Sequence, residues 1–477
     1  MSSVSSETAI ERFVPVAAAT ADRPEPVKPR AAEAMLDGPV LPTLLRLAAP
    51  TIALMSLQGI VSAGETAFIG RLGPSALAGV SLSFPLVMLM TTLSAGAYGG
   101  GVASRVARAL GSGKVEEARG LTGTALGLAA LIGVAYTLAM QLGGGAIYRA
   151  LGASGPSLAA AVRYSDLMFL SATPFWIFGA AASVLRGTGN AAYPALVGAV
   201  GGVVTLAVSP LLIFGAGPFP GLGIAGAAAA IVAYNVAAML ALLRPLWRPG
   251  SVVRPAWSML IPRWRHTVEI LRIAIPSGCG TILTNATVLV LTGFVAPFGE
   301  AATAGYGAAG RLEYLLIPVV FGIGSALVPL VAANDGAGRA DRVRQFTRAG
   351  ALLGMAVCAV VGLTVAIAPQ LWMGLFTTDA SVQAIGESYL RRVGPAFPCL
   401  GLGLALYFAS QGRGRMVPPL LATSTRLLIS SLGGALVIRA ATGSLDSLFH
   451  VMSAGLAAYA LIMVFVMRRE LGLVASE

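Results

Sequence analysis

The chain has 477 residues, of which 56% are hydrophobic and only 11% are charged, and its net charge is +12. Soluble globular proteins contain about 25% charged residues, so the composition argues against a soluble protein. No polar Lys/Arg-rich run with interleaved aromatic residues is present, and this argues against nucleic acid as the partner of the positive charge.

The chain begins with a polar segment and continues as a series of apolar stretches. Residues 1–40 are rich in Ala, Pro, Glu and Ser and are predicted to be a disordered cytoplasmic tail. No charge occurs in residues 72–104, 120–148 or 187–243, and a spanning helix needs roughly 20 apolar residues. We expect twelve spans, at residues 41–70, 74–104, 119–142, 158–186, 191–214, 222–244, 268–296, 302–334, 346–370, 384–412, 416–438 and 446–467.

Positive charge is concentrated in alternate loops, which predicts the orientation of the chain. Lys and Arg accumulate in loops that remain in the cytoplasm, so we expect both termini there, in a multi-pass protein of the inner (plasma) membrane. The clusters follow span 2, span 6 and span 8, and one lies at the C-terminus: Arg105, Arg108, Lys114 and Arg119; Arg244, Arg248, Arg254, Arg263, Arg265 and Arg272; Arg339, Arg342, Arg344 and Arg348; Arg468 and Arg469.

The chain matches itself at an offset of 225 to 226 residues, at four places in the same order. The segment LLRLAAP at 44–50 matches ILRIAIP at 270–276, and GSGKVEEAR at 111–119 matches GAGRADRVR at 336–344. Four glycine and alanine positions at 73–79 recur at 299–305. Gly187, Gly189 and Pro194 recur at 412, 414 and 419.

The repeat predicts an all-α membrane protein with twelve transmembrane helices in two six-helix bundles. Each half has an even number of spans, so the halves enter the bilayer in the same direction and a pseudo-two-fold axis runs along the membrane normal. We expect an N-terminal lobe at 41–244, a cytoplasmic linker at 245–267 and a C-terminal lobe at 268–470. Such repeats are typical of transporters, with a small-molecule site at the repeat interface.

The predicted linker contains three tryptophans, Trp247, Trp257 and Trp264. Tryptophan is enriched at both membrane–water interfaces. We expect this segment to lie at the cytoplasmic headgroup boundary of the lipid bilayer.

Glu65 is the clearest functional candidate because it is a carboxylate inside a spanning segment. Such a charge is costly in the membrane and is a functional hypothesis by default. Gln58 and Ser62 precede Glu65 by seven and three residues, so the three share one helix face that should line a cavity. Removing water from a carboxylate favours its protonated form, so we expect proton exchange near neutral pH. The alternative is a structural acid hydrogen-bonded to neighbouring helices.

Four further polar residues in the spans are candidates for the same cavity. Thr205 and Ser209 lie four residues apart, just before Pro210, although their hydroxyls can instead bond to carbonyls of their own helix. Asn235 and Asn285 are weaker candidates, because an asparagine in a span also serves to hold helices together.

Glu313 and Arg426 form a second candidate feature. An arginine in the middle of a span must find a partner or water, and Glu313 is one available partner. A structural ion pair is the favoured interpretation.

Other classes of site have little support. The two histidines, His266 and His450, are too few and too far apart for a metal cluster, and the three cysteines show no CxxC spacing. We expect no metal and no cofactor, only a proton or sodium as coupling ion. We expect no enzyme, because the spans contain no clustered catalytic groups. The protein is expected to be a monomer.

The segment SAGETAFIGRLG at 62–73 resembles the first-helix motif of the multidrug and toxic compound extrusion (MATE) family, in particular its DNA-damage-inducible protein F branch. GSGKVEEAR, LRGTGNAAYP at 185–194 and SPLLIFG at 209–215 resemble the family's loops after helices 2 and 4 and its helix 5. The resemblance covers nearly the whole N-terminal half. It implies a V-shaped exporter of organic, often cationic, compounds in exchange for protons or sodium.

The resemblance also implies roles for individual residues. Glu65 takes the place of the first-helix aspartate, and Thr205 and Ser209 take the places of an asparagine and an aspartate that some members carry. With one carboxylate left, we expect proton coupling through Glu65 and export of cationic, lipophilic compounds. The alternatives are sodium coupling, or a flippase for a lipid-linked precursor from the same superfamily.

Overall fold

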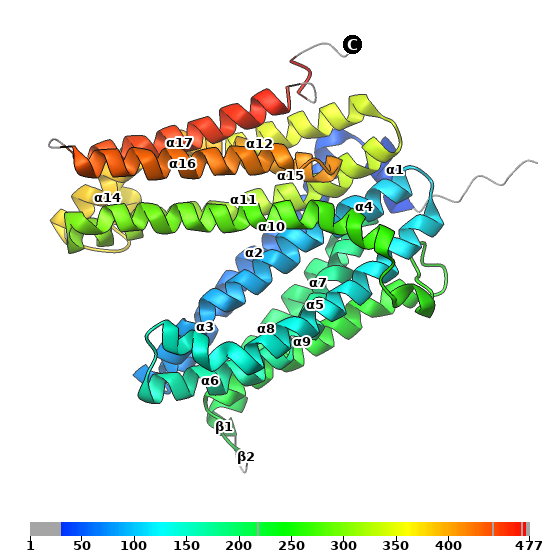
Figure 1. Cartoon of the computed structure of the whole chain (residues 1–477), viewed down its shortest axis with the longest axis horizontal. Helices are drawn as coiled ribbons and strands as arrows, with labels where there is room; N and C mark the ends of the chain where they lie inside the picture. Colours follow the sequence, from blue (N-terminus) through cyan, green and yellow to red (C-terminus); the bar gives the residue numbers. More distant parts are fainter. Residues whose placement is uncertain (1–29, 217–218, 441–442, 469–470, 474–477) are drawn as a thin grey trace, which may run out of the picture.

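A computed structural model describes residues 30–216, 219–440, 443–468 and 471–473, and Figure 1 shows its helices as two bundles that meet at one end. The first bundle, here called the N lobe, follows a short helix α1 (Arg30–Asp37). The N lobe consists of α2 (Val40–Gly70), α3 (Pro74–Thr92), a π-helical turn η1 (Leu93–Tyr98), α4 (Gly99–Gly111), α5 (Val115–Ala150), α6 (Gly155–Leu170), α7 (Ala172–Gly187), α8 (Ala192–Phe214) and α9 (Ile224–Trp247).

The second bundle, the C lobe, repeats this plan. Two short antiparallel strands of the N lobe, β1 (Gly215–Ala216) and β2 (Phe219–Pro220), lie between α8 and α9. A 3₁₀ turn η2 (Trp257–Leu260) lies between the lobes. The C lobe consists of α10 (Trp264–Val295), η3 (Ala296–Phe298), α11 (Glu300–Gly336), α12 (Ala340–Ile367), α13 (Gln370–Met373), α14 (Ala380–Val393), η4 (Gly394–Ala396), α15 (Phe397–Arg413), α16 (Val417–Arg439) and α17 (Leu445–Val466).

The prediction of twelve apolar spans in two lobes is confirmed. In the described part of the chain, eleven helical segments are long and apolar enough to cross a membrane, and α6 and α7 form a twelfth span with a bend of 47°. The bend lies at Ser171, three residues before Pro174, which lacks the N–H that would continue the helical ladder. The predicted boundaries differ from those in the structure by a few residues, and the interlobe linker shortens to 248–263.

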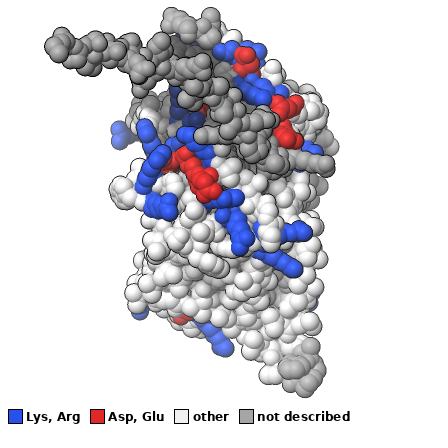
Figure 2. Space-filling model, turned by 90° about the vertical axis from the view of Figure 1, so that its right-hand side faces the viewer, with Lys and Arg blue, Asp and Glu red and all other residues white. Residues whose placement is uncertain are grey.

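The two lobes contact each other at one end of the molecule, here called the closed end. α4 packs against α10, α11 and α15 of the other lobe, and α2 packs against α11 and α12. The described starts of α1 and α2 and the end of α17 also lie there (Figure 1). Figure 2 views this end and shows Lys and Arg side chains gathered on it. The opposite end, where the lobes diverge in Figure 1, is called the open end.

The internal repeat is visible in the packing of glycines. A methyl group on Gly187 would lie 3.1 Å from the backbone oxygen of Ala103. Its repeat counterpart Gly412 has the same relation to Val328, the counterpart of Ala103, at 2.8 Å. Glycine is required at both places because the neighbouring helix backbone comes so close. The lobes therefore share this close helix contact.

The prediction that residues 1–40 are disordered is wrong for residues 30–37, which form α1; residues 1–29 lie outside the described part of the chain. Met35 and Leu36 of α1 are 1% and 4% exposed, so burial of apolar surface favours an ordered segment. Asn334 donates from Nδ2 to the Met35 carbonyl at 3.0 Å, and Arg339 donates to the Leu36 carbonyl at 2.8 Å. Composition alone predicted disorder because it contains no information about these contacts with the C lobe.

Candidate functional site

The close packing of α2 on α8 determines the position of Glu65. A methyl group on Gly64 would lie 2.6 Å from Leu206 Cδ1, and one on Gly198 would lie 2.8 Å from Leu54 Cδ1. Small residues at the contact between two transmembrane helices let their backbones approach closely in this way. Glu65 follows Gly64 in this contact region, and its carboxyl approaches Ser209 of α8.

The Glu65 carboxyl lies beside the hydroxyl of Ser209 on α8 and interacts with it electrostatically. Its field also reaches the buried Tyr164 of α6. Oε1 of Glu65 and Oγ of Ser209 are both buried, and neither meets the distance and angle criteria of a hydrogen bond with a described partner. A carboxyl oxygen without a fixed hydrogen-bond partner in such a place is free to take a proton or a cationic group.

The other members of the predicted α2–α8 cavity set lie nearby but behave differently. Gln58 and Ser62 are exposed on α2. Thr205 is buried, and its hydroxyl donates to the Gly201 carbonyl of its own helix at 2.8 Å. The structure therefore brings Glu65 and Ser209 together, while the Thr205 hydroxyl is already engaged by the helix backbone.

The hydrogen bonds that the two predicted asparagines form go to residues other than Glu65. Asn235 on α9 is buried and donates from Nδ2 to the Ser171 hydroxyl at 2.9 Å, at the bend between α6 and α7. Asn285 on α10 is exposed and donates to the Thr281 carbonyl of its own helix at 2.9 Å. Asn235 thus joins α9 to the bent span.

Glu313 and Arg426 meet inside the C lobe. Nη2 of Arg426 on α16 lies 3.4 Å from Oε1 of Glu313 on α11, and the side chains are 9% and 20% exposed. Gly455 on α17 lies beside the arginine, and a methyl group there would be in ordinary contact with Arg426 Cγ, at 3.6 Å. The partner that an arginine in a span requires is therefore supplied by another helix of the same lobe.

Sequence reasoning missed a group of charges at the closed end, here called the closed-end triad: Arg108, Asp335 and Arg413. Nη1 of Arg108 in the N lobe forms an ion pair with Asp335 in the C lobe, and Nη2 of Arg413 lies 3.4 Å from the same carboxylate. The only sequence signal was the matched GSG and GAG loops beside Arg108 and Asp335, and the arginines were interpreted as orientation signals.

Backbone contacts accompany the closed-end triad. Ser104 donates to the Gly412 carbonyl at 3.0 Å, and Arg108 donates to the Arg413 carbonyl at 3.0 Å. Gln411 donates from Nε2 to the Gly96 carbonyl at 3.1 Å, which is a further bond between lobes. The last carbonyls of a helix have no partners within it, so α15 offers its unsatisfied end to donors from α4.

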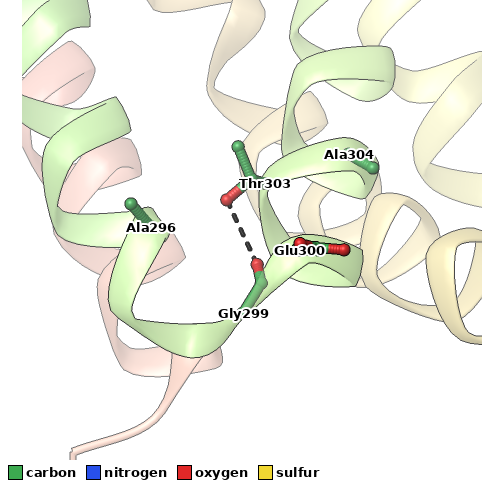
Figure 3. Close-up of a pocket in the computed structure, with 5 residues that line it drawn as sticks. All are labelled: Ala296, Gly299, Glu300, Thr303 and Ala304. Atoms are coloured by element: carbon green, nitrogen blue, oxygen red, sulfur yellow. Dashed lines mark hydrogen bonds between the residues drawn. The ribbon is translucent and has the colours of Figure 1, made fainter.

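A pocket of about 470 Å³ lies at the open end, at the turn from α10 to α11 (Figure 3). Ala296, Gly299, Glu300, Thr303 and Ala304 line it, and the Thr303 hydroxyl donates to the Gly299 carbonyl at 3.1 Å. Glu300 is in the first turn of α11, where a negative charge is favoured by the helix dipole. The pocket contains none of the predicted site residues.

Metal chemistry has no support among the described residues, where no group of three or more His, Cys, Asp or Glu side chains is placed to hold an ion. Cys279, Cys358 and Cys399 are unpaired. The chemistry available in the spans is therefore that of single carboxyl, guanidinium and hydroxyl groups.

The sequence profile of the MatE family matches residues 50–211 and 276–436. The chain belongs to the MATE family. The two matched ranges keep the offset of 225 to 226 residues that the internal repeat has, so each lobe carries one copy of the family domain. MATE proteins are transporters and not enzymes, which confirms that expectation for this chain.

Known relatives match along most of their length. The chain is 28% identical to an FAD transporter of Shewanella oneidensis, over 83% of this chain and 88% of the relative. It is 26% identical to the probable multidrug resistance protein NorM of Thermotoga maritima, over 83% and 85%. It is 26% identical to the multidrug export protein MepA of Staphylococcus aureus, over 92% and 96%.

The fold agrees with solved MATE structures. An outward-facing multidrug resistance MATE transporter superposes with a TM-score of 0.84 at 22% identity, covering 94% of this chain and 99% of that one. A MATE structure in a bent conformation gives a TM-score of 0.83 at 22% identity, covering 94% and 98%. The chain is thus a multi-pass membrane transporter of small molecules with the two-lobe MATE architecture.

Proposed function

We propose that the protein is a secondary-active antiporter that exports organic, cationic and lipophilic compounds in exchange for protons. Its arginine-rich closed end lies in the cytoplasm, with both termini, and its open end faces the outside of the inner membrane. The distribution of Lys and Arg supports this orientation, because positive loops remain on the cytoplasmic side. In this orientation a compound bound between the lobes is released outward.

Glu65 is the coupling residue in this proposal. The observation that carries it is the buried Oε1 of Glu65, which lacks a described hydrogen-bond partner. A permanently bonded structural acid would have both oxygens engaged, so this arrangement favours a group that exchanges ligands. Ser209 provides a neutral hydroxyl beside the carboxyl.

The proposed cycle follows from the charge on Glu65. The ionised carboxylate attracts a cationic compound, and a proton entering from the open end neutralises it and weakens that attraction. Release of the proton at the cytoplasmic side restores the charge. Because proton and compound compete for one carboxylate, their movements in opposite directions are coupled.

A second candidate concerns the substrate. The Shewanella oneidensis relative is described as an FAD transporter, and FAD is an aromatic compound that carries phosphates. Arg426 is a nine-tenths buried cation in the C lobe, although Glu313 lies 3.4 Å away and offsets its charge. An anionic aromatic substrate would use Arg426, whereas a cationic one would use Glu65.

Transport by the purified full chain in proteoliposomes tests both candidates. A proton gradient or a sodium gradient is imposed separately, and movement of several lipophilic cations and of FAD is measured. We expect the cations to move when the proton gradient is imposed and not when the sodium gradient is. Response to sodium alone would refute proton coupling, and movement of FAD without the cations would establish the second candidate. No response to either gradient would refute the antiporter.

A further inference from the structure

The linker between the lobes, together with the first residue of α10, presents an exposed aromatic surface with positive charges beside it. Trp257, Ile261 and Trp264 are 75%, 73% and 82% exposed. Large apolar side chains of this size are rarely left in water together, so this surface needs a partner. We call Trp257, Ile261 and Trp264, together with Arg254 and Arg263, the linker surface.

The inner side of the linker is fixed, so the linker surface is held outward. A methyl group on Gly123 of α5 would lie 2.5 Å from the Met259 carbonyl oxygen, and one on Gly127 would lie 1.8 Å from that of Leu260. The linker backbone therefore lies directly on a glycine face of α5.

Hydrogen bonds hold the same inner side. Arg119 donates from Nε to the Val252 carbonyl at 3.0 Å, and Val253 is 2% exposed. His266, at the start of α10, is buried with its Nδ1 3.4 Å from the Thr124 hydroxyl. Both ends of the exposed stretch are thus attached to α5, and Trp257 remains 75% exposed although its ring lies 5.4 Å from that of Trp247.

The charge of the segment is of one sign. Residues 245–267 include Arg248, Arg254, Arg263 and Arg265 and no Asp or Glu. Arg265 is 3.3 Å from Glu269 on the next helical turn, whereas Arg254 and Arg263 are exposed on the linker itself. Because the flanking helices α9 and α10 are membrane spans, the segment is continuous with the lipid-facing band of the protein.

We infer that the linker surface binds anionic phospholipid headgroups. Tryptophan is suited to the headgroup region because its ring is apolar and its N–H is polar. Clustered arginines next to a span attract anionic lipids, and guanidinium groups match phosphate oxygens in geometry. Since the linker joins the two lobes, its attachment to lipid fixes the height of their junction relative to the membrane.

Quenching of tryptophan fluorescence by brominated phospholipids tests this inference on the full chain in nanodiscs. Phosphatidylglycerol and phosphatidylcholine are compared at equal content of the brominated lipid. We expect brominated phosphatidylglycerol to quench more strongly than brominated phosphatidylcholine, and we call this difference the excess. The excess should be lost in a Trp257→Phe, Trp264→Phe double variant. In Arg254→Gln, Arg263→Gln, quenching by phosphatidylcholine should persist while the excess disappears.

A control double variant removes two exposed arginines of the open end, Arg71→Gln and Arg439→Gln, and should keep the excess. Equal quenching by both lipids in the wild type would overturn the preference for anionic lipid. Absence of quenching at Trp257 and Trp264 would show that the surface binds something other than lipid. The assay needs no substrate and no gradient, so its failure is distinct from a failure of the proposed transport.

Discussion

Tyr234 in the N lobe and Tyr459 in the C lobe are repeat counterparts, and the residues that they meet differ. Tyr234 lies against Gly201, where an added methyl group would be 2.2 Å from its ring. Tyr459 lies within the field of Arg426, which is the counterpart of Gly201. The same helix crossing therefore contains a small residue in one lobe and a buried charge in the other.

The reverse holds for Glu65. Its counterpart in the C lobe is Leu291, which is 5% exposed, and the counterpart of Ser209 is Gly434. Each lobe thus carries its polar group where the other is apolar. The glycine contacts that build the helix pairs are common to both lobes, so they reflect the shared fold. The charged groups differ between lobes, so the shared fold does not require them.

The closed-end triad shows the same asymmetry at the junction of the lobes. The N lobe supplies one arginine, and the C lobe supplies the aspartate and the second arginine. The repeat counterparts of Arg108, Asp335 and Arg413 are Ala333, Leu110 and Thr188. The junction is therefore held by one set of charges and not by a symmetric pair.

The largest expected effect is that of Glu65→Gln. If the N lobe alone carries coupling, this variant should lose proton-driven export, because glutamine cannot take up or release a proton. Proton-driven transport in proteoliposomes measures this loss. Glu300→Gln is the matched control because Glu300 is an exposed carboxylate of the open end. Near-normal export by Glu65→Gln at wild-type expression would remove Glu65 from the mechanism and make the lobes equivalent in this respect.

The next effect is that of Asp335→Asn, which removes the carboxylate shared by two arginines. We expect the closed end to open more often, because a lost charge partner costs about 1–3 kcal/mol when the remaining group is largely buried. The distance between spin labels at Lys114 and Gln345, one in each lobe, measures the opening in a variant without the native cysteines. Glu116→Gln, which affects an ion pair within one lobe, is the control. An unchanged distance distribution would show that backbone contacts alone hold the junction.

A smaller effect is expected for the pair in the C lobe. Arg426→Gln and Glu313→Gln should each lower stability by about 1–3 kcal/mol, because each leaves an uncompensated group. The double variant should recover part of this loss, since the N lobe folds with Gly201 at the equivalent position. Thermal or chemical denaturation of all three variants in detergent gives the coupling free energy, expected at about 0.5–3 kcal/mol. Simple additivity would show that the two residues do not act as a pair.

The fold could be predicted from the sequence because its signals are local. Uncharged stretches define the spans, and the recurrence of Gly187 as Gly412 follows from helix contacts that tolerate no side chain. Pro174 predicts a kink in the fourth span, but a proline alone gives neither the size of the bend, 47°, nor its position at Ser171. Helix α1 was missed because its stability depends on contacts with the distant C lobe.

The candidate site was only partly accessible from sequence. The burial cost of a carboxylate identified Glu65, but nothing local shows which of Thr205 and Ser209 faces it. In the structure the Thr205 hydroxyl bonds to its own helix, and Ser209 lies beside the carboxyl. Arg108 of the closed-end triad lies more than 200 positions from both Asp335 and Arg413, so no spacing rule could find the group.

The smallest expected effect concerns two helix starts that correspond in the repeat, Ser154 before α6 and Asp379 before α14. Asp379 caps its helix, because its Oδ1 accepts bonds from the Ser381 N–H at 2.8 Å and the Val382 N–H at 3.1 Å, whereas the Ser154 side chain makes no such bond. The Ser381 hydroxyl and these two N–H groups hold the pKa of Asp379 below its usual range. Asp379→Ala should therefore lower the thermal midpoint at neutral pH by about one degree.

The pH dependence separates the cap from other effects of the substitution. A carboxyl with a lowered pKa in the folded state stabilises the protein above its unfolded pKa of about 3.9 and loses this contribution as the pH falls through the folded value. The difference in thermal midpoint between wild type and Asp379→Ala should thus disappear in acid, and Ser154→Ala should have no effect at either pH. A difference that persists in acid would mean that Asp379 acts through its shape and not its charge. An equal loss in both variants would mean that the two lobes begin these helices in the same way.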